Sequence, residues 1–577
     1  MRVGSLVTIA LNIIDNLAAN GVQRIYGIAG DSLNGLTEAM RTSEMDWITV
    51  RHEEAAALAA SAEAATTGEL AVCAGSAGPG NLHLINGLYD AQRSRVPVLA
   101  IAAHIPSDEI GSLYFQETSP AELFRECSVW AQVVTSPEQM PRAVRIAMQE
   151  AVSRQGVAVL VLPGDVALQE ATSQDISQVQ HTWARVVPAD EELEQAARLL
   201  NDCSKVTILA GAGTAGAHSE VMALADTLAA PIVHAMRGKE HIAFDNPFDV
   251  GMTGLLGFAS GYRAMAEAQT LLMLGTDLPY QQFYPEDATI IQVDIRGENL
   301  GRRVALDLGM VGDVGETARA LLPRLRPKDR GHLEASVKHY RRTRESLDDL
   351  ATPTKAGRPI RPQYLARVLD EQASEDAVFI PDVGSPVVWA ARHLTMNGRR
   401  RLIGSFAHGT MANALTQAIG VQFAHPNRQV VAMAGDGGLA MLLGELLTVV
   451  QHQLPVKIVV HNNSSLNFID LEMKAAGFPP FATELVNPDF ARVAKSMGIT
   501  GLRVTESADL VESVRQAFDH PGPVLLDVVT EPNELTIPPA ITTEQVKGFT
   551  LYMLRTVMSG RGDELIDLAR ANLRQIF

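Results

Sequence analysis

Apolar runs alternate with amphipathic stretches along most of the chain, and one arrangement of them occurs three times. Each unit begins with a short β-rich apolar run and a glycine turn, continues with an amphipathic helical stretch, and ends with a proline that leads into another apolar run. The first runs read LAVCAGSAGPG, VTILAGAGTAGAH and VVAMAGDGG. The glycine and the proline lie 22, 20 and 20 residues apart, at positions 75 and 97, 211 and 231, and 435 and 455.

Apolar strands that alternate with helices are typical of βαβ units and of parallel sheets buried on both faces. We therefore expect an α/β fold with three doubly wound parallel-sheet domains. Polar, proline-rich or glycine-rich stretches without periodicity at 169–192 and 324–362 separate the units. The expected domains are residues 1–180, 185–345 and 355–530, followed by a C-terminal tail of residues 531–577.

Composition narrows the class of protein. The 577 residues carry a formal net charge of −18, which argues against nucleic acid as a partner because phosphate binding needs a basic surface. The three cysteines, Cys73, Cys127 and Cys203, lie far apart without a CxxC pair. This spacing suits a reducing cytoplasm and provides no cysteine-rich metal site.

The apolar N-terminus is interrupted by Asn12, Asp15 and Asn16. We expect it to form an amphipathic helix that ends at Gly21 rather than a signal peptide. No uninterrupted apolar run of about 18 residues occurs, so the sequence predicts no membrane-spanning helix.

Polar side chains follow two neighbouring strands of the third unit. Asp436 comes after one predicted strand, and Asn463 comes 27 residues later after the next. Ligands of open α/β sheets bind beyond the carboxyl ends of the strands, so both side chains should face one crevice. Their oxygens suit Mg²⁺, and the adjacent glycines allow backbone N–H groups to approach a diphosphate.

The segment GDGGLAMLLGELLTVVQHQLPVKIVVHNN resembles the motif of thiamine-diphosphate enzymes, which opens with GDG and closes with paired asparagines. The resemblance implies that Mg²⁺ is bound by the side chains of Asp436 and Asn463 and by the main-chain carbonyl of Ser465. SFAHGTMANAL resembles the segment of that family that bends the cofactor, with Met411 as an apolar prop. The residues implied to contact thiamine diphosphate are Gly409, Thr410, Met411, Asp436, Gly437, Gly438, Asn463, Ser464, Ser465, Leu466, Asn467, Phe468 and Ile469.

Two glutamates open an alanine-rich helix in the first unit, at RHEEAAALAA. Acids in a first helical turn interact favourably with the helix dipole, and this explains Glu54. The segment also resembles the one in which a glutamate hydrogen-bonds the aminopyrimidine ring of the cofactor and promotes deprotonation of its thiazolium C2 carbon, and Glu53 matches that position. His52 is interpreted as structural. In this family the glutamate reaches a cofactor held by a neighbouring subunit, which implies at least a dimer.

The middle unit contains GAGTAG, a literal GxGxxG after a strand. A nicotinamide site also needs an acid at the end of the second strand, where this chain has His234, so NAD is not expected. DVGMTGLLGF, MLGTDLPY and IIQVDIRGEN resemble the FAD-contacting segments of flavin-bearing thiamine enzymes. The residues implied to line the flavin are Gly211, Gly213, Thr253, Gly254, Leu255, Leu256, Thr276, Asp277, Leu278, Pro279, Tyr280, Asp294, Ile295, Arg296, Gly297, Glu298 and Asn299, with Asp294 at an adenosine hydroxyl.

The tail has an amphipathic pattern over Gly562–Phe577, with apolar residues on one half of a helical wheel and charges on the other. Such a helix packs on its own domain or lies in a membrane interface, and by periodicity alone packing is the commoner outcome. AITTEQVKGFTLYMLRTVMSGRGDELIDLA resembles the C-terminal region of bacterial pyruvate:quinone oxidoreductases, in which the terminal helix mediates lipid binding and activation.

This resemblance implies the oxidative decarboxylation of pyruvate to acetate and CO₂, with electrons passed through FAD to ubiquinone or menaquinone in the membrane. Asn467 stands where relatives commonly carry glycine, and because asparagine tolerates a left-handed backbone we expect the loop to be retained. The implied catalytic residues are Glu53, Gln116 near the substrate, and Phe115, Val383 and Phe468 between the two cofactors, for which core packing is the alternative.

Three other functions stay open from the sequence: an acetolactate synthase-type carboligase with structural FAD, a phosphate-dependent pyruvate oxidase, and a lipid-binding scaffold that has lost catalysis. The favoured function implies pyruvate, a membrane quinone and membrane lipid as partners, the last through the C-terminal helix. It also implies a homo-oligomer, expected as a dimer of dimers, that is peripheral to the cytoplasmic side of the cell membrane.

Overall fold

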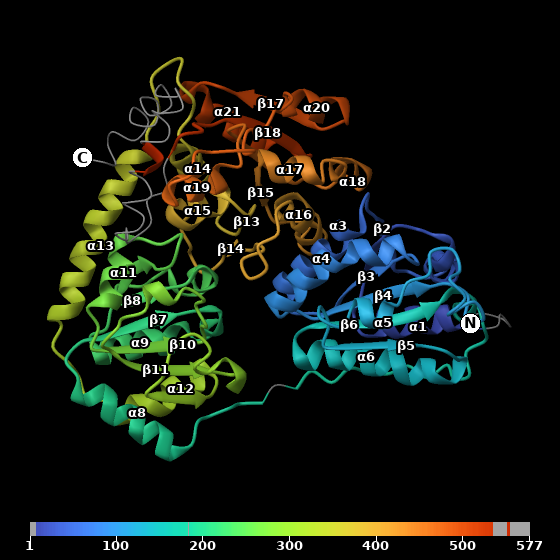
Figure 1. The fold of residues 1–577 in the computed structure, drawn as a ribbon, viewed down its shortest axis with the longest axis horizontal. Helices are drawn as coiled ribbons and strands as arrows, with labels where there is room; N and C mark the ends of the chain where they lie inside the picture. The colour runs from blue at the N-terminus through green and yellow to red at the C-terminus, as the bar shows by residue number, and fades with distance from the viewer. Residues whose placement is uncertain (1–6, 183, 535–550, 554–577) are drawn as a thin grey trace.

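Three six-stranded parallel sheets, each covered by helices, make up the computed structural model of the chain (Figure 1). The structure describes residues 7–182, 184–534 and 551–553. The expected fold class, three doubly wound α/β domains, is confirmed. The amphipathic segment Gly562–Phe577 lies outside the described residues. Within the described ranges, no helix is long and apolar enough to cross a membrane.

The N-terminal domain has its strands in the order β2-β1-β3-β4-β6-β5, all parallel. The strands are β1 (Arg24–Gly27), β2 (Asp46–Thr49), β3 (Ala71–Gly75), β4 (Val98–His104), β5 (Trp130–Val133) and β6 (Val157–Pro163). The helices are α1 (Ile9–Ala19), α2 (Asn34–Arg41), α3 (Glu53–Thr67), α4 (Pro79–Ser94), α5 (Pro120–Leu123), α6 (Met140–Arg154) and α7 (Gly164–Ala167).

The C-terminal domain repeats this topology, with the strand order β14-β13-β15-β16-β18-β17. Its strands are β13 (Val378–Pro381), β14 (Arg401–Leu402), β15 (Val430–Gly435), β16 (Lys457–Asn462), β17 (Thr500–Val504) and β18 (Val524–Val529). Its helices are α14 (Pro362–Gln372), α15 (Ser385–His393), α16 (Asn413–Ala424), α17 (Asp436–Met441), α18 (Glu445–Gln451), α19 (Asn467–Ala475), α20 (Phe490–Ser496) and α21 (Ser507–Asp519).

One helical stretch differs from the expectation. The single helix predicted after GDGG is divided into α17 and α18, with Gly444 immediately before α18. Glycine is a poor helix former, and the interruption turns Glu445 toward the N-terminal domain, where its carboxylate accepts a hydrogen bond from the Arg51 N–H at 2.9 Å.

The middle domain has a different order, β12-β11-β10-β7-β8-β9. Numbered within the domain, this is the 3-2-1-4-5-6 order of dinucleotide-binding folds. Its strands are β7 (Val206–Ala210), β8 (Ile232–His234), β9 (Asp249–Met252), β10 (Thr270–Leu274), β11 (Thr289–Asp294) and β12 (Leu308–Val311). Its helices are α8 (Asp190–Asp202), α9 (His218–Leu228), α10 (Lys239–Ile242), α11 (Ala259–Ala266), α12 (Val314–Leu321) and α13 (Gly331–Leu350).

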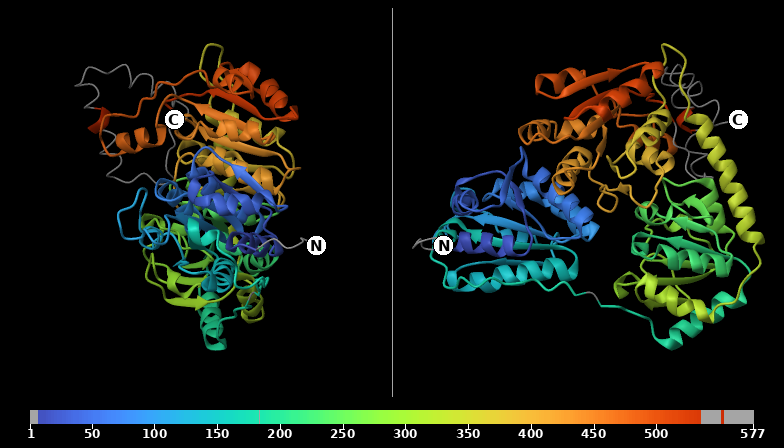
Figure 2. Two further views of the ribbon diagram at one scale, coloured as in Figure 1. Left: turned by 90° about the vertical axis from the view of Figure 1, so that its right-hand side faces the viewer. Right: turned by 180° about the vertical axis from the view of Figure 1, so that it is seen from behind.

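A single hydrophobic core joins the N-terminal and C-terminal domains. It runs from alternate residues of the first sheet through α3, α4, α16 and α18 to alternate residues of the third sheet. The middle domain connects to the first through an extended linker and to the third along α13, which lies on the outside of the molecule (Figures 1 and 2). The three domains therefore surround a common centre, where the carboxyl ends of strands from the middle and C-terminal sheets meet.

Candidate active site

Asp436 and Asn463 lie at the carboxyl ends of neighbouring parallel strands, as expected. Asp436 begins α17 directly after β15, and Asn463 directly follows β16. The order of the third sheet reverses between β13 and β15, and such a reversal is the usual position of a ligand in an open α/β sheet. Asp436 is 3% exposed, and its Oδ2 accepts hydrogen bonds from the N–H groups of Asn463 (3.1 Å) and Ser464 (2.6 Å).

Two opposing effects act on the pKa of the Asp436 carboxyl. Burial raises the pKa of the carboxyl above its ordinary value, while the backbone N–H groups of Gly437 and Ser464 favour the carboxylate and lower it. A bound cation would favour the carboxylate further.

The residues after β16 fit Mg²⁺ by the chemistry of their donors. Ser464 has a φ of 55°, in the left-handed region, and this turn allows Ser465 to form an antiparallel bridge with Glu484. One carboxylate, one amide oxygen and a main-chain carbonyl form the hard oxygen set that Mg²⁺ prefers, with phosphate and water completing its shell. No group of three or more His, Cys, Asp or Glu suited to a metal occurs in the part of the chain that the structure describes, so a metal here depends on such additional oxygens.

The glycine turn after β15 is closely packed. A Cβ on Gly438 would lie 1.9 Å from Oδ2 of Asp382, and one on Gly437 would lie 3.5 Å from Cε of Met411. Asp382, which follows β13 and is buried, was not among the predicted site residues. Burial raises the pKa of its carboxyl to about 7, although it accepts backbone N–H groups, including that of Val383 at 3.0 Å. Asp382 therefore joins the β13 end to the glycine turn.

A second missed residue is Asn487, which lies in the loop before α20. Its Nδ2 donates to Oδ2 of Asp436 at 2.8 Å and to Oδ1 of Asn462 at 2.9 Å. In the sequence, only the dipeptide Asn487–Pro488 marks this loop, and such a dipeptide is ordinarily interpreted as a turn.

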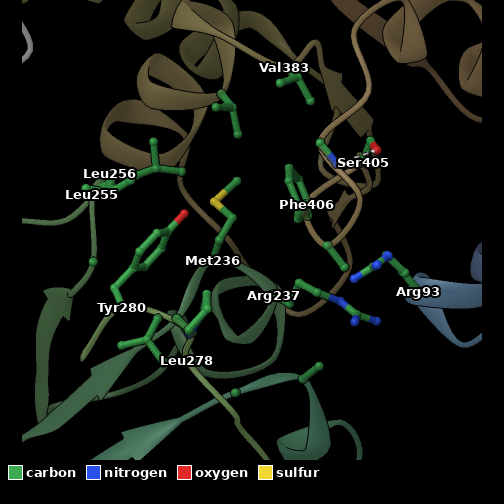
Figure 3. A pocket seen from close by; sticks show the side chains of 18 of the residues that line it. Arg93, Met236, Arg237, Leu255, Leu256, Leu278, Tyr280, Val383, Ser405 and Phe406 are labelled. Carbon is green, nitrogen blue, oxygen red and sulfur yellow. Dashed lines mark hydrogen bonds between the residues drawn. The ribbon is translucent and has the colours of Figure 1, made fainter. Parts of the chain in front are cut away.

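One cavity of about 1230 Å³ extends from the crevice that contains Asp436 and Asn463, the candidate magnesium crevice, into the middle domain. This volume exceeds the usual size of a site for one small ligand. Figure 3 shows side chains from all three domains around it, with Val383 and Phe406 facing Met236, Leu256 and Tyr280. Among the predicted residues, Gly211, Gly213, Thr253–Leu256, Thr276–Tyr280, Asp294, Ile295, Arg296, Glu298, Asn299, Val383, Gly409, Met411, Asp436–Gly438, Asn463, Ser465 and Leu466–Ile469 line it. Gly297, Thr410 and Ser464 lie next to lining residues without lining it themselves.

The middle-domain part of the cavity lies at the reversal of its strand order, between β7 and β10. Gly211 follows β7 and Thr276 follows β10, and a Cβ on Gly211 would lie 2.4 Å from that of Thr276. Asp294 ends β11 and uses its Oδ1 to accept from Arg296 N–H (2.9 Å) and Asn299 Nδ2 (3.1 Å). Its other oxygen is left to accept a hydroxyl, so this crevice fits an adenine dinucleotide.

His234 occupies the end of β8, where an NAD-binding acid is expected. It is buried, and burial lowers its pKa to about 4, with Asp249 Oδ1 3.7 Å from its Nε2. Arginines that the sequence did not point to also line this cavity. Among them are Arg93 and Arg95, from the end of α4, and Arg237. Figure 3 shows the Arg93 and Arg237 side chains converging from different domains. Three guanidinium groups suit a phosphate-bearing ligand.

Glu53 begins α3 and is 5% exposed, with its Oε2 2.9 Å from Nδ1 of His83. His52 is the N-cap of the helix, since its Nδ1 accepts the Glu54 N–H at 3.2 Å. The interpretation of Glu54 as a helix-start acid is incomplete. Its Oε1 accepts from Nδ2 of Asn86 (2.6 Å), which also donates to Oγ1 of Thr410 (2.7 Å).

The structure of one chain does not bring the N-terminal catalytic candidates to the cavity that contains Asp436 and Asn463. Glu53, Phe115 and Gln116 are not among the described residues that line the cavity. Phe115 is 78% exposed, and Gln116 has a φ of 66° in the same loop. The sequence pattern does not predict how far these residues lie from the third domain.

Asn467 uses its side chain rather than a left-handed backbone. It begins α19, and the positive φ in this loop belongs to Ser464, so the left-handed tolerance invoked for Asn467 is not needed. Its Oδ1 accepts from Ser385 Oγ (2.9 Å), and its Nδ2 donates to the Pro532 carbonyl (2.6 Å). The asparagine thus fixes the start of α19 against α15.

Comparison with known proteins gives three matches to models of thiamine pyrophosphate enzymes. The N-terminal TPP binding domain matches residues 7–123, the central domain matches 193–321, and the C-terminal TPP binding domain matches 382–528. Similar proteins include YdaP of Bacillus subtilis, to which thiamine pyrophosphate is ascribed (36% identity over 96% of this chain and 97% of the relative). They also include pyruvate oxidase of Lactiplantibacillus plantarum (30%; 90% and 87%) and acetolactate synthase of Arthrospira platensis (30%; 90% and 94%).

Proposed function

The chain belongs to the thiamine pyrophosphate enzymes and is related to pyruvate oxidase and acetolactate synthase, and on that basis we propose that it is a pyruvate:quinone oxidoreductase. The proposed overall reaction converts pyruvate, water and a quinone into acetate, CO₂ and the quinol. Two electrons and two protons pass to the quinone, and the oxygen of water enters acetate.

The observation that supports this proposal most directly is the continuous cavity. Residues at the magnesium crevice and residues at the dinucleotide crevice of the middle domain line the same space. When bound, thiamine diphosphate supplies a thiazolium that accepts the electron pair left by CO₂, and FAD supplies a two-electron acceptor. Two cofactors bound in one continuous cavity would lie close enough for direct electron transfer between them.

The side chains have separate tasks in this proposal. Asp436, Asn463 and the Ser465 carbonyl would hold Mg²⁺, and the Gly437 and Gly438 N–H groups would approach the diphosphate. Met411 fills the space beside the glycine turn and would support the cofactor. Val383 and Phe468 line the same cavity, and in this proposal their apolar side chains lie between the two cofactors and exclude water.

The position of Glu53 outside the cavity supports the proposal that the enzyme is a homo-oligomer. In one chain Glu53 does not line the cavity that contains Asp436, and neither do Phe115 and Gln116. We therefore propose that these residues complete the site of a second copy, in a dimer that pairs into a tetramer. The exposure of Phe115, 78%, supports a surface that another chain covers.

Electron delivery to a membrane quinone requires contact with the membrane. The sequence of the tail, with its amphipathic stretch Gly562–Phe577, supports a peripheral association with lipid on the cytoplasmic side. We propose that lipid binding by this helix stimulates turnover with quinone.

Anaerobic addition of pyruvate to the FAD-loaded protein tests the proposal. The flavin should bleach, a soluble quinone should restore its colour, and acetate should accumulate. An unbleached flavin with acetolactate as product would indicate a carboligase, and acetyl phosphate with peroxide formed in air would indicate a phosphate-dependent oxidase. A folded protein that binds lipid but turns over no pyruvate would indicate a scaffold.

The membrane role has its own experiment. Deletion of residues 562–577 should abolish stimulation by phospholipid vesicles and leave the basal rate of flavin reduction by pyruvate unchanged. Stimulation that persists after the deletion would refute the assigned role of the tail without affecting the assigned reaction.

A further inference from the structure

The two carboxylate oxygens of Asp436 have unequal numbers of donors. Oδ2 accepts from the N–H groups of Asn463 and Ser464 and from Nδ2 of Asn487, at 3.1, 2.6 and 2.8 Å. Oδ1 accepts from the Gly437 N–H alone, at 2.9 Å. A carboxylate oxygen has two lone pairs, so the donors saturate Oδ2 and leave one lone pair on Oδ1.

We propose that Asn487 is a positioning residue that makes Asp436 a one-oxygen ligand and thereby selects Mg²⁺ over larger cations. Together with the Asn463 and Ser464 N–H groups, the Asn487 amide holds Oδ2 and keeps the carboxylate from turning both oxygens toward a metal. Coordination is then confined to Oδ1. This inference rests on the magnesium site but not on the proposed oxidation of pyruvate.

The loop that carries Asn487 is fixed on both sides. Before it, the Leu485 N–H donates to the Ser464 carbonyl at 2.9 Å. After it, Pro488 disfavours a helical backbone at Asn487, and the Phe490 N–H donates to Oδ2 of Asp527 at 3.1 Å. An amide on such a loop holds its direction, as a residue that orients a metal ligand must.

A chain of buried polar groups supports the amide from behind. The second N–H of Asn487 Nδ2 donates to Oδ1 of Asn462, and Nδ2 of Asn462 donates to Oδ1 of Asp527 at 2.8 Å. Asp527 is completely buried and also pairs with Arg503. The first asparagine of the predicted pair therefore orients Asn487, while the second remains the candidate ligand.

The two cations respond differently to a freed carboxylate. Mg²⁺ requires near-octahedral geometry with short bonds, whereas Ca²⁺ accepts carboxylates through one or two oxygens at longer distances. Without the Asn487 amide, two of the three donors remain on Oδ2, so the carboxylate is held less firmly and can turn Oδ2 toward a cation more easily. The change should weaken Mg²⁺ binding and leave Ca²⁺ binding less affected.

Equilibrium dialysis of the full-length protein with thiamine diphosphate and either Mg²⁺ or Ca²⁺ tests this inference. Asn487→Ala should weaken Mg²⁺ binding by about 10- to 100-fold, the usual effect of removing the hydrogen-bond partner of a metal ligand. The loss for Ca²⁺ should be smaller, so the preference for Mg²⁺ falls. Arg492→Ala, on the exposed side of the following helix, should change neither affinity.

Asn487→Ser provides a second variant whose hydroxyl is too short to replace the amide, and it should show the same loss of preference. Thermal unfolding of each variant without metal establishes that it is folded. An unchanged ratio of the two affinities in a folded variant, or an equal loss for both cations, would overturn the inference. Neither measurement uses pyruvate, so failure of the proposed reaction leaves it intact.

Discussion

At the scale of single residues, neighbouring side chains of the same type have different tasks. Glu53 lies against His83, while Glu54 contacts Asn86, which reaches Thr410 in another domain. Asn462 accepts a hydrogen bond from Asn487, while Asn463 is the candidate metal ligand. The fixed directions of side chains at a strand end or a first helical turn separate these roles.

Replacement of Glu53 by glutamine tests its catalytic role. The glutamine keeps the volume and one acceptor oxygen for His83 but cannot take up or share a proton. Turnover of pyruvate should fall by about 10²- to 10⁴-fold, the usual contribution of general acid–base catalysis. Binding of thiamine diphosphate and Mg²⁺, measured by dialysis, should change little.

The exposed Glu44→Gln serves as the matched control for that experiment and should retain full turnover. If Glu53→Gln turns over pyruvate at the rate of the unmodified protein, Glu53 has no role in proton transfer. A variant that no longer binds the cofactor would assign Glu53 to binding.

At the scale of elements, the alanine-rich helix α3 allows unusually close approach of its neighbours. A Cβ on Gly87 of α4 would lie 2.5 Å from Cβ of Ala57, and one on Gly420 of α16 would lie 2.0 Å from the Ala59 carbonyl oxygen. The small side chains of α3 therefore let it lie close to its neighbours. This packing joins the two thiamine-binding domains within one chain.

Gly420→Ala should therefore destabilise the protein despite the better helix propensity of alanine. Propensity favours alanine by about 1 kcal/mol, whereas overpacking a core commonly costs about 1–3 kcal/mol, and here the obstacle is backbone rather than a movable side chain. The urea midpoint should fall. Gly315→Ala in α12, where nothing lies closer than 3.3 Å, should leave it nearly unchanged; equal effects would contradict the packing argument.

Helix α15 connects the two crevices of the cavity. It begins beside Val383, and near its end the buried Arg392 donates to the carbonyls of Leu256 and Gly257, both at 3.2 Å. These carbonyls belong to the loop that is implied to contact the flavin. The helix thus fixes the position of that loop relative to the diphosphate domain.

Arg392→Met should weaken FAD binding because it removes both donors while retaining an apolar side chain. Leaving a buried carbonyl unpaired costs about 1–3 kcal/mol, so the dissociation constant should rise by about tenfold or more. Equilibrium dialysis with FAD measures the change. Arg399→Met, at an exposed ion pair, is the control, and an FAD affinity equal to that of the control would separate α15 from flavin binding.

At the scale of the whole molecule, the sequence was sufficient for the three domains because each repeats the same strand, glycine and helix pattern. It was also sufficient to place Asp436 and Asn463 at one sheet edge, because both follow directly from strand ends. It was insufficient for Asn487, His83 and Arg95. Asn487 and Arg95 reach the site from a loop and a helix end, and His83 contacts Glu53 from within α4, at positions where polar residues resemble ordinary surface residues. Contacts of that kind depend on tertiary packing, which periodicity does not encode.

Buried ionisable groups give the folded chain opposing responses to pH. Burial raises the pKa of Asp382 to about 7, so this group favours the folded state more as the pH falls. His393, the last residue of α15, acts in the other direction. Burial lowers its pKa to about 3, and the charges of Arg344, Arg392, Lys239 and Arg367 add to the effect.

His393→Leu should therefore make the protein less sensitive to acid. An unfolded histidine has a pKa near 6.5, above the folded value, so the stability associated with the neutral ring is fully present above pH 6.5 and is lost as the pH falls. For one proton, the loss between pH 7 and pH 5 is about 2 kcal/mol. Urea unfolding followed by tryptophan fluorescence at both pH values should show the variant losing that much less than the unmodified protein. Because Asp382 and the other carboxyls are the same in both proteins, their contributions cancel in the difference. An equal pH dependence of the two proteins would mean that the pKa of His393 is the same in the folded and unfolded states, as for a solvated ring.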